Sequence, residues 1–312
     1  MNSRNSILSN QSDRGPLVMA VVLNYRGYED TVKCIQSLQN ATYSNLGIII
    51  VDNGSPDGSG NKLKNAFLDV PIILLKENTG YAAGNNAGIR FALEQKAEYV
   101  LVINNDVIVD PAFLEPMVEI AEKQSDVGIV TCKVFFQSSR DEIFSGAGKM
   151  NWWLCTGVNK GNHLKFLQRH DDQCYTDFAC GVLMLMRKNV LETKGLFDER
   201  YFMYFEDIEY SRRILQQYKI VYTPSGVAYH KSGGGKGWRS YTELYLYYHT
   251  RNRIWAFRND PLLYRLYVLI FSFVNVILKT LILTCNMRRD YRKMIRQMRS
   301  LWNGFRDGLF KD

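Results

Sequence analysis

The stretch that specifies the architecture most clearly is Tyr99-Val-Leu-Val-Ile-Asn-Asn-Asp-Val-Ile-Val109, in which two apolar runs flank three short polar side chains. The first run, Tyr99 to Ile103, has the unbroken apolar character of a strand that is buried on both faces. Asn104, Asn105 and Asp106 then interrupt it. At the carboxyl end of a strand in an open α/β sheet, such residues lie where ligands bind. A β-turn, selected for backbone reasons alone, is the competing interpretation.

Apolar runs alternate with helical spacings on both sides of this stretch. Buried strands are predicted over residues 17–23, 46–51, 72–75, 99–103 and 127–136, and helices over 28–40, 61–67 and 82–96. Pro111 is expected to open the following helix, at a position where the missing N–H of proline costs little. Strands that alternate with helices form parallel sheets covered on both faces, so the expected fold class is α/β with a Rossmann-like, mostly parallel sheet.

After Phe136 the alternation is weaker. The pattern predicts a strand over residues 180–186, a helix over 205–217, short strands over 220–222 and 227–229, and an aromatic helix over 241–258.

Composition separates a nearly neutral main domain from a basic tail. The 312 residues, 46% of them apolar, are enough for one large domain or two smaller ones. Net charge is +8, and the segment from Ala256 to Asp312 alone holds eleven lysines and arginines against four aspartates. This distribution argues against nucleic-acid binding and favours contact of the tail with an anionic surface.

The six cysteines are scattered without C-x-x-C spacing, which argues against a zinc site or a redox motif. Free thiols in a reducing cytoplasm are the simplest interpretation. Residues 1–15 are polar, lack the apolar core of a signal peptide, and are expected to form a disordered arm. The predicted location is therefore cytoplasmic.

Residues 262–285 are strongly apolar, but Arg265 and Lys279 interrupt the run and leave less than the roughly 20 residues that a membrane span needs. Residues 288–299 follow as a basic amphipathic helix. An apolar helix beside a basic one favours a position in the membrane interface, so we expect the tail to bind the anionic cytoplasmic face of a membrane. The alternatives are a helical hairpin packed on the main domain and a true membrane span.

Polar residues follow the first four predicted strands, and in a parallel sheet they share one edge, as in a nucleotide pocket. They are Asn24, Tyr25, Asp52, Asn78, Gly80, Gly84, Asn85, Asn104, Asn105 and Asp106. Asp52 can accept a hydrogen bond from a base or ribose, and Gly80 and Gly84 let backbone approach a ligand closely. The Asp106 carboxylate is a hard oxygen ligand for Mg²⁺ or Mn²⁺. The sequence contains neither a G-x-G-x-x-G turn after the first strand nor a P-loop.

Glu206 and Asp207 are adjacent carboxylates near the start of the helix predicted over 205–217, framed by aromatic residues. They could cap that helix, whose dipole favours negative charge at this end. Desolvation by the aromatic rings could instead raise a carboxylate pKa and poise the group as a base. His230 precedes a glycine-rich loop and is a further candidate metal ligand, although a lone histidine is more often structural.

Taken in order, these motifs resemble the inverting glycosyltransferase family 2, in particular its rhamnosyltransferase-like branch. The resemblance covers about residues 17–255, and its motifs are Asn24-Tyr25, Asp52-Asn-Gly-Ser, Asn78-x-Gly80-x-x-x-Gly84-Asn-Asn, Asn104-Asn-Asp106, Cys180-Gly181, Tyr204-Phe-Glu206-Asp207 and Tyr229-His230. It implies a GT-A fold, a nucleoside-diphosphate sugar donor and a divalent cation. The D-x-D signature of the family is Asn-Asn-Asp here, so Asp106 is its one remaining carboxylate.

The resemblance also implies roles for single residues. Asp52 would hold the nucleobase, Asp106 and His230 the metal or diphosphate, and Asp207, next to Glu206, would be the general base. Lys236 and Arg239 lie on the glycine-rich loop and are expected to fold over the diphosphate as a lid, with solvated charges as the alternative.

The expected organisation is a disordered arm (1–15), a GT-A domain (16–258) with a nucleotide-binding half (16–136) and an acceptor half (137–258), and a helical tail (259–312). The expected reaction moves a sugar, L-rhamnose at the level of the family, from a dTDP- or UDP-sugar to a glycan or lipid-linked acceptor in cell-surface polysaccharide synthesis. A sugar nucleotidyltransferase is the alternative enzyme, but Asn24-Tyr-Arg-Gly27 is a poor match to the glycine-rich, arginine-containing loop that such an enzyme normally has after its first strand. An inactive sugar-binding or membrane-scaffold protein is the non-enzyme alternative.

Overall fold

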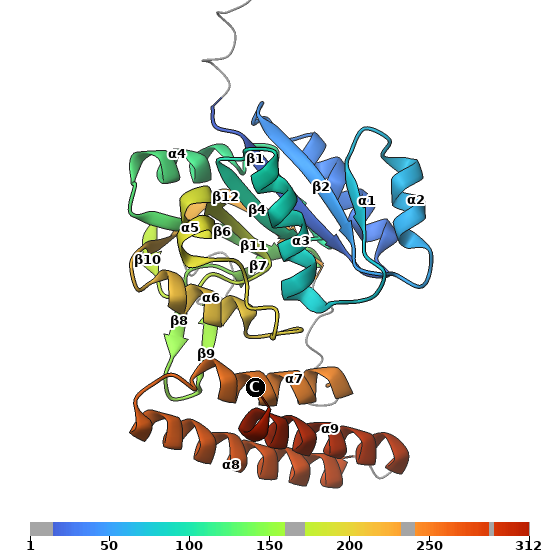
Figure 1. The fold of residues 1–312 in the computed structure, drawn as a ribbon, viewed down its shortest axis with the longest axis vertical. Coiled ribbons are helices and arrows are strands. Elements are labelled where there is room, and N and C mark those ends of the chain that lie inside the picture. Colours follow the sequence, from blue (N-terminus) through green and yellow to red (C-terminus); the bar gives the residue numbers. More distant parts are fainter. Residues whose placement is uncertain (1–14, 160–171, 232–240, 287–289, 312) are drawn as a thin grey trace, which may run out of the picture.

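The computed structural model describes residues 15–159, 172–231, 241–286 and 290–311, and in them ten strands form one mixed sheet (Figure 1). The strands are β1 (Val18–Asn24), β2 (Leu46–Asp52), β3 (Ile72–Leu74), β4 (Tyr99–Asn104), β5 (Val107–Val109), β6 (Val127–Phe136), β7 (Ser139–Ser145), β10 (Cys174–Thr176), β11 (Leu183–Arg187) and β12 (Lys219–His230). Their order is β10-β12-β6-β11-β4-β1-β2-β3, with β5 paired to β12 and β7 to β6. A separate hairpin consists of β8 (Gly148–Asn151) and β9 (Thr156–Asn159).

The first half of the sheet is parallel, as the alternation of strands and helices predicted. β3, β2, β1 and β4 are parallel neighbours, whereas β11 lies antiparallel between β4 and β6. The predicted α/β fold with a mostly parallel sheet is confirmed, and the sheet is mixed beyond β4.

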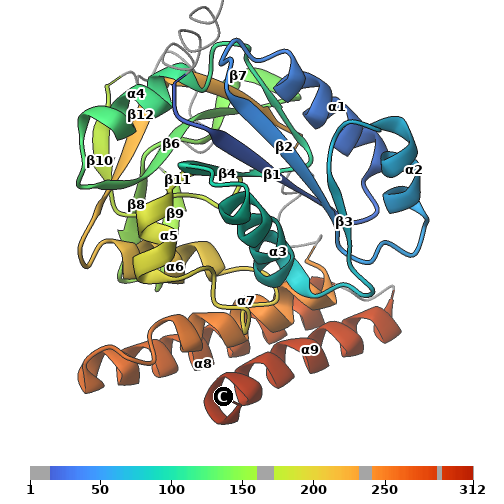
Figure 2. The same cartoon turned by 45° about the horizontal axis from the view of Figure 1, so that its top comes forward.

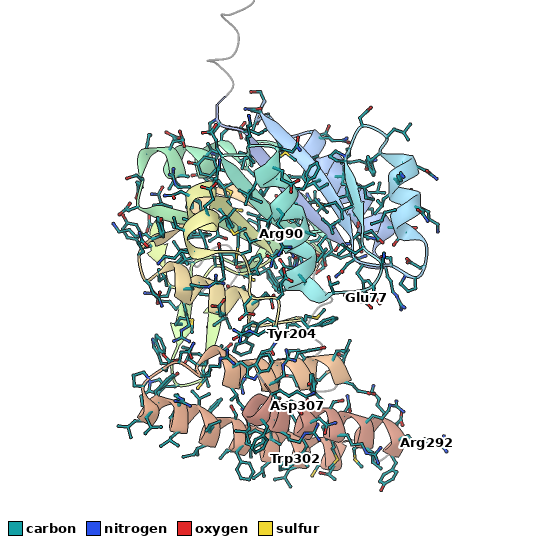
Figure 3. All side chains as sticks on the ribbon, viewed as in Figure 1. Glu77, Arg90, Tyr204, Arg292, Trp302 and Asp307 are labelled. Carbon is teal, nitrogen blue, oxygen red and sulfur yellow. The ribbon has the colours of Figure 1, made fainter. Side chains whose placement is uncertain are left out.

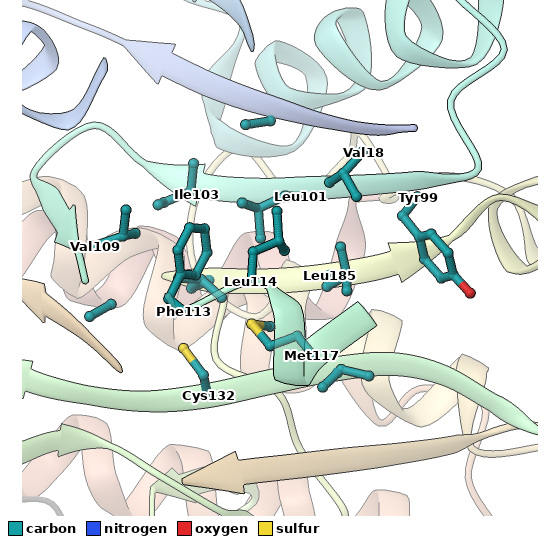
Figure 4. Close-up of a cluster of buried hydrophobic side chains, with 14 of the residues drawn as sticks. Val18, Tyr99, Leu101, Ile103, Val109, Phe113, Leu114, Met117, Cys132 and Leu185 are labelled. Atoms are coloured by element: carbon teal, nitrogen blue, oxygen red, sulfur yellow. The ribbon is translucent and has the colours of Figure 1, made fainter. Parts of the chain in front are cut away.

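Helices cover both faces of the sheet, as Figures 1 and 2 show. They are α1 (Tyr28–Gln39), α2 (Ser59–Ala66), α3 (Gly80–Glu94), α4 (Glu115–Lys123), α5 (Lys188–Lys194) and α6 (Glu206–Ile214). In β4, Leu101 and Ile103 pack with α1 and α4, in the cluster shown in Figure 4. Val100 and Val102 point to the other face and pack with α3, α5 and α6. Because both faces are buried, every position of the run must be apolar.

The helix predicted to open at Pro111 begins later. Residues 111–114 form a turn, and α4 begins at Glu115 with Pro116 in its first turn. The Pro111 carbonyl accepts hydrogen bonds from the backbone N–H and the hydroxyl of Thr42, at 2.9 and 3.0 Å. Pro111 therefore ties this turn to the loop after α1 instead of starting a helix.

Two predicted strand boundaries also differ. Residues 220–222 and 227–229 belong to one strand, β12, whose pairing with β6 shifts between Thr223 and Val227. Pro224 falls in that irregular part, where its missing N–H interrupts the ladder. The strand predicted over 180–186 begins only at Leu183, because the residues before it form a loop against α6.

The C-terminal helices form a layer beneath the α/β domain (Figures 1 and 2). They are α7 (Glu243–Ala256), α8 (Leu262–Asn286) and α9 (Tyr291–Phe310), with α7 next to the domain. α8 continues through Arg265 and Lys279, and its stretch Leu262–Cys285 is long and apolar enough to cross a membrane by length and composition. Arg265 and Lys279 thus interrupt the apolar run but not the helix, and α9 extends to Phe310, beyond the predicted residue 299.

Candidate functional site

The Asn-Asn-Asp turn lies between β4 and β5, where β12 brings in His230. β5 pairs antiparallel with β12 so that Val107 lies opposite His230. The backbone N–H of Lys231 donates to the Asp106 carbonyl at 2.9 Å. As a result, His230 Nε2 lies 3.0 Å from Asp106 Oδ1, and the two residues predicted to hold a metal are neighbours.

The Asp106–His230 pair fits a divalent cation as part of its ligand set. Ligand distances of about 2.1 Å around an octahedral Mg²⁺ place neighbouring ligand atoms about 3 Å apart. The separation of Nε2 and Oδ1 matches this spacing. Within the described residues, no group of three or more His, Cys, Asp or Glu side chains comes together. A cation held by these two side chains alone would keep positions for diphosphate oxygens and water, the arrangement that Mg²⁺ commonly adopts with phosphorylated substrates.

The two asparagines of the turn contribute differently. Asn105 Nδ2 donates to Thr31 Oγ1 at 2.9 Å, which ties the turn to α1. The backbone N–H of Asn104 donates to the Val182 carbonyl at 3.0 Å, which ties it to the loop before β11. The Asn104 side-chain oxygen is buried and has no hydrogen-bond partner in the described part of the chain. Asn104 therefore keeps an unused acceptor inside the protein, and its contact with a ligand stays a prediction.

Asp52 ends β2 in a buried hydrogen-bond network. Its Oδ1 accepts from Asn24 Nδ2 at 2.6 Å, and its Oδ2 accepts from the backbone N–H of Ser55 at 3.1 Å. A carboxylate oxygen can accept more than one hydrogen bond. Asp52 also lines a cavity of about 300 Å³ formed by the loops after β2 and β3. Asn24 thus orients a carboxylate that can still bind a ligand.

The predicted residues at the start of α3 have packing roles. Asn78 Oδ1 accepts from the backbone N–H of Gly80 at 2.9 Å and caps the entry to the helix. Gly80 has φ +89°, and a Cβ there would lie 2.3 Å from the Phe202 carbonyl oxygen. A Cβ on Gly84 would lie 2.6 Å from the Leu23 side chain. The close approach that both glycines permit is therefore made by protein, and their role toward a ligand stays a prediction.

Four further residues were predicted to bind the sugar-nucleotide donor. Asn85 Nδ2 donates to the Tyr81 carbonyl at 2.9 Å, within the first turns of α3. Tyr25 is exposed, with the Arg26 guanidinium 5.3 Å from its ring centre. Lys236 and Arg239 lie outside the described residues. Ligand binding by these side chains stays a prediction.

Glu206 and Asp207 are the first residues of α6, where the helix dipole favours negative charge. Asp207 Oδ2 accepts from the backbone N–H of Gly181 at 3.1 Å, and Oδ1 from that of Ile208 at 2.9 Å. Burial raises the pKa of Asp207 to about 6, although these N–H groups act to lower it. Glu206 is more deeply buried, and burial together with the Asp207 charge raises its pKa well above the usual value. Asp207 is therefore the more accessible carboxylate and titrates near neutral pH.

The chain enters α6 through a strained turn. Tyr204 and Phe205 have φ of +69° and +72°, a left-handed conformation that costs roughly 1–2 kcal/mol per non-glycine residue. Asn252 of α7 is fully buried, and its Nδ2 donates to the carbonyls of Met203 and Tyr204 at 2.9 and 2.7 Å. Arg251 Nε in turn donates to the Asn252 side-chain oxygen at 2.8 Å. Figure 3 shows Tyr204 between the α/β domain and α7, so α7 holds the turn that aims the two carboxylates.

The loop before β11 joins the two halves of the site. Gly181, whose N–H reaches Asp207, precedes Val182, whose carbonyl accepts from Asn104. The Tyr81 hydroxyl donates to the Gly181 carbonyl at 2.5 Å and braces the loop against α3. The polar turn after β4 and the Asp207 carboxylate are therefore bound to successive residues of one loop.

Asn252 and Tyr81 belong to this site, and neither is among the residues that the sequence motifs predict for it. Tyr81 lies inside the motif Asn78 to Asn86, and this place in the motif could have indicated that it belongs to the site. Asn252 lies in an aromatic helix without any local motif, and its partners are 48 and 49 residues away in the chain. No pattern near Asn252 could have identified it.

The sequence model of a family described as Glycosyl transferase family 2 matches residues 19–194. Glycosyltransferase GlyG of Streptococcus pneumoniae is 36% identical over 118 residues, which cover 36% of this chain and 38% of that protein. A low-salt glycan biosynthesis hexosyltransferase of Haloferax volcanii is 25% identical over 201 residues, or 62% of this chain and 60% of that protein. An N-acetylglucosaminyl-diphospho-decaprenol L-rhamnosyltransferase of Mycobacterium tuberculosis is 23% identical over 233 residues, 68% of this chain and 75% of that protein.

The matched regions therefore span less than two thirds of the first two relatives. Among solved structures, the crystal structure of GalNAc-T7 with UDP, GalNAc and Mn²⁺ superposes with a TM-score of 0.62 at 13% identity. The match covers 96% of this chain and 57% of that one. At this identity the likeness shows a shared fold, and it confirms the GT-A type.

Proposed function

The chain belongs to glycosyl transferase family 2, whose sequence model covers more than half of its 312 residues, and from this premise we propose that it is an inverting glycosyltransferase. The donor is a nucleoside-diphosphate sugar, held with its base toward Asp52 and its diphosphate toward Asp106. The acceptor is a glycan or a lipid-linked glycan of a polysaccharide pathway.

The observation that supports this proposal most strongly is the loop of Gly181 and Val182. It ties the polar turn of Asp106 to a partly exposed carboxylate, Asp207, whose pKa of about 6 suits a base near neutral pH. A diphosphate site beside such a base is what transfer of a sugar to a hydroxyl group requires.

In the proposed reaction, Asp207 accepts the proton of the acceptor hydroxyl. The acceptor oxygen forms a bond to the anomeric carbon while the bond from that carbon to the diphosphate oxygen breaks on the opposite side, so the configuration inverts. A Mg²⁺ or Mn²⁺ ion held by Asp106 and His230 supplies positive charge for the leaving diphosphate when bound. Asn24 orients Asp52 and Asn252 orients the turn before Asp207.

For the donor we propose dTDP-L-rhamnose first and a UDP-sugar second. The Mycobacterium tuberculosis relative is named as an L-rhamnosyltransferase that acts on a decaprenol-linked substrate, and the GalNAc-T7 structure contains UDP. The GalNAc-T7 structure supports a nucleoside-diphosphate sugar as the class of donor, and the Mycobacterium tuberculosis relative supports L-rhamnose and a lipid-linked acceptor.

A thermal-shift panel of nucleotide sugars with and without Mn²⁺ tests the donor class. A dTDP- or UDP-sugar is expected to raise the Tm, because a ligand that binds only the folded state stabilises that state. The increase in Tm should be larger with Mn²⁺. Stabilisation by nucleoside triphosphates and sugar phosphates instead would favour a sugar nucleotidyltransferase. If no nucleotide sugar raises the Tm, the proposal is wrong.

The rate of sugar transfer is expected to fall with pH as Asp207 becomes protonated. With a pKa of about 6, the carboxylate is the main form above that pH, and about a tenth remains one unit below it. Transfer at about pH 5 should therefore be about tenfold slower than on the plateau above pH 7. Cys180 and Tyr81, its neighbours, keep their protons here because burial raises the pKa of both thiol and phenol. A profile that stays flat down to pH 5 would contradict the assignment of Asp207.

Asn252→Ala is expected to lower kcat by about 10- to 100-fold with little change in donor affinity, since a small displacement of a catalytic group has such effects. The variant loses both hydrogen bonds that hold the left-handed turn. Adding Tyr204→Gly should restore part of kcat, because glycine adopts positive φ without strain. Full kcat in Asn252→Ala would show that α7 does not position the base.

A further inference from the structure

The outer face of α8 is apolar and uncovered. Its buried stripe, which includes Val276 and Leu283, packs with α7 and α9. The exposed residues are Leu262, Leu263, Leu266, Ile270, Phe273, Val274, Ile277, Leu278 and Leu281. Within Leu262–Cys285, all of which the structure describes, Arg265 is the one exposed charged side chain. Lys279, the other charge of this helix, is buried with its ammonium group 5.6 Å from the Tyr241 ring. Single exposed apolar residues are normal on a protein surface, but a contiguous apolar face of this length marks an interaction site.

The β8–β9 hairpin lies near the start of α8 (Figure 1). At its tip Trp153 is 78% exposed, and Leu154 beside it is also exposed. The Tyr267 hydroxyl of α8 donates to the Trp153 carbonyl at 2.7 Å, and that of Tyr264 donates to the Trp152 carbonyl at 2.6 Å. The hairpin of the catalytic domain is therefore fixed to α8, and its exposed tryptophan suits a membrane–water interface.

Positive charge lies along the other border of the same face. Trp302 of α9 contacts Phe273 of α8, with ring centres 6.2 Å apart, and Figure 3 shows Trp302 on the side of the helical layer away from the α/β domain. The exposed arginines of α9 recur at helical spacing beside it, and they are Arg292, Arg296, Arg299 and Arg306. Some of them are paired, as Arg296 is with Glu243, yet the row remains positive. Apolar surface bordered by arginine matches an anionic lipid surface.

The packing of the layer decides between lying on a membrane and crossing it. A Cβ on Gly304 of α9 would lie 2.4 Å from the Tyr247 carbonyl oxygen of α7, so the two helices are in close contact. α7 is in turn bound to the α/β domain through Asn252. A crossing α8 would have to leave α7 and α9 or carry their charged side chains into the bilayer, which is costly. Lying flat preserves all these contacts and covers the exposed face.

We propose that α8, the tip of the β8–β9 hairpin and the adjoining side of α9 form one surface that lies flat on an anionic phospholipid bilayer. This proposal is independent of the proposed reaction, because it predicts lipid binding and not turnover.

Vesicle flotation with the full chain tests the surface. The wild type should float with vesicles of phosphatidylcholine and phosphatidylglycerol, and less with phosphatidylcholine alone. Leu263→Glu combined with Ile270→Glu should weaken binding by about tenfold or more, since two apolar contacts with lipid are lost. Trp153→Ala should weaken it without lowering the Tm. Leu68→Glu is the matched control, because Leu68 is 84% exposed and Leu263 83%, and Leu68 lies between α2 and β3; this variant should bind as the wild type does.

Several results would overturn the proposal. They are a wild type that does not bind vesicles, a Leu263→Glu/Ile270→Glu variant that binds unchanged, and protein that resists alkaline extraction as a spanning helix would. A lipid-free dimer that only the double variant dissociates, with lipid binding intact, would assign the face to a second copy of the chain. Equal binding to neutral and anionic vesicles at low salt would show that the arginines of α9 do not take part in lipid binding.

Discussion

Asp207→Asn is expected to lower the rate of sugar transfer by on the order of 10²–10⁴-fold, the usual worth of a general base. Asparagine keeps the size of the side chain and one oxygen that can accept from the Gly181 or Ile208 N–H, but it cannot take a proton. Donor affinity should change little, because the base acts on the acceptor. Sugar transfer and donor binding are measured on the same preparation, the first by release of nucleoside diphosphate and the second by calorimetry.

Glu206→Gln is the matched variant for this prediction, since it neutralises the neighbouring carboxylate. Glu206 is buried and its Oε2 has no hydrogen-bond partner in the described residues, so we expect a much smaller loss of rate. An inactive Glu206→Gln enzyme beside a nearly active Asp207→Asn enzyme would reverse the assignment. Loss of donor binding in Asp207→Asn would place Asp207 in the diphosphate site instead.

Asp207→Asn should also stabilise the fold at neutral pH. The folded-state pKa of about 6 lies above the ordinary value of 3.8, so the carboxylate destabilises the fold above about pH 6. This cost is about 3 kcal/mol at most. It declines as the pH falls from about 6 to 3.8, and it is absent below the unfolded-state pKa. Asp207→Asn should therefore have a higher Tm than the wild type at about pH 8, and the difference should shrink at about pH 5. A lower Tm at both pH values would show that Asp207 is a structural cap.

Asp106→Ala is expected to abolish the Mn²⁺-dependent part of donor binding and to weaken binding in the presence of Mn²⁺ by at least about 100-fold, since even outer partners of metal ligands contribute 10- to 100-fold. It removes the one carboxylate of the Asn104-Asn-Asp106 turn and leaves His230 as a single ligand. Calorimetric titration with a nucleoside diphosphate, with and without Mn²⁺, measures both parts.

Asp110→Ala is the control for this variant. Asp110 is an exposed carboxylate at the end of β5, and among the described residues its Oδ1 accepts from the nearby Ala112 N–H. It should keep wild-type binding with and without Mn²⁺. Equal Mn²⁺ dependence in Asp106→Ala and the wild type would show that the metal, if any, is held elsewhere.

The parts of the fold that could be predicted are those in which burial constrains every position. β6 matches its predicted range, residues 127–136, because the whole strand is buried. β7, by contrast, has the polar sequence Ser-Arg-Asp-Glu-Ile-Phe-Ser and is half exposed. β8, β9 and β10 are short, and their pairing depends on partners distant in the sequence. No local pattern could have located these four strands.

The site residues also include some that could be predicted from the sequence and some that could not. Asp52, Asp106 and Asp207 could be selected because each is a carboxylate at the end of a strand or the start of a helix. That Asp106 meets His230 depends on the register of β5 with β12, which a sequence does not show. The role of Asn252 depends on a left-handed turn at Tyr204 whose strain is visible only in the structure.

At the carboxyl edge of the sheet, the proposed sugar transfer inverts the configuration of the anomeric carbon. The most direct test of this transfer is ¹H NMR of a nucleotide sugar incubated with the enzyme and Mn²⁺, with or without acceptor, because water can replace the acceptor hydroxyl. The first product, sugar or glycoside, is expected to have the anomeric configuration opposite to that of the donor, and Asp207→Asn is expected to form it far more slowly. A first product with the configuration of the donor, or no cleavage of any dTDP- or UDP-sugar that binds, would contradict the proposed transfer.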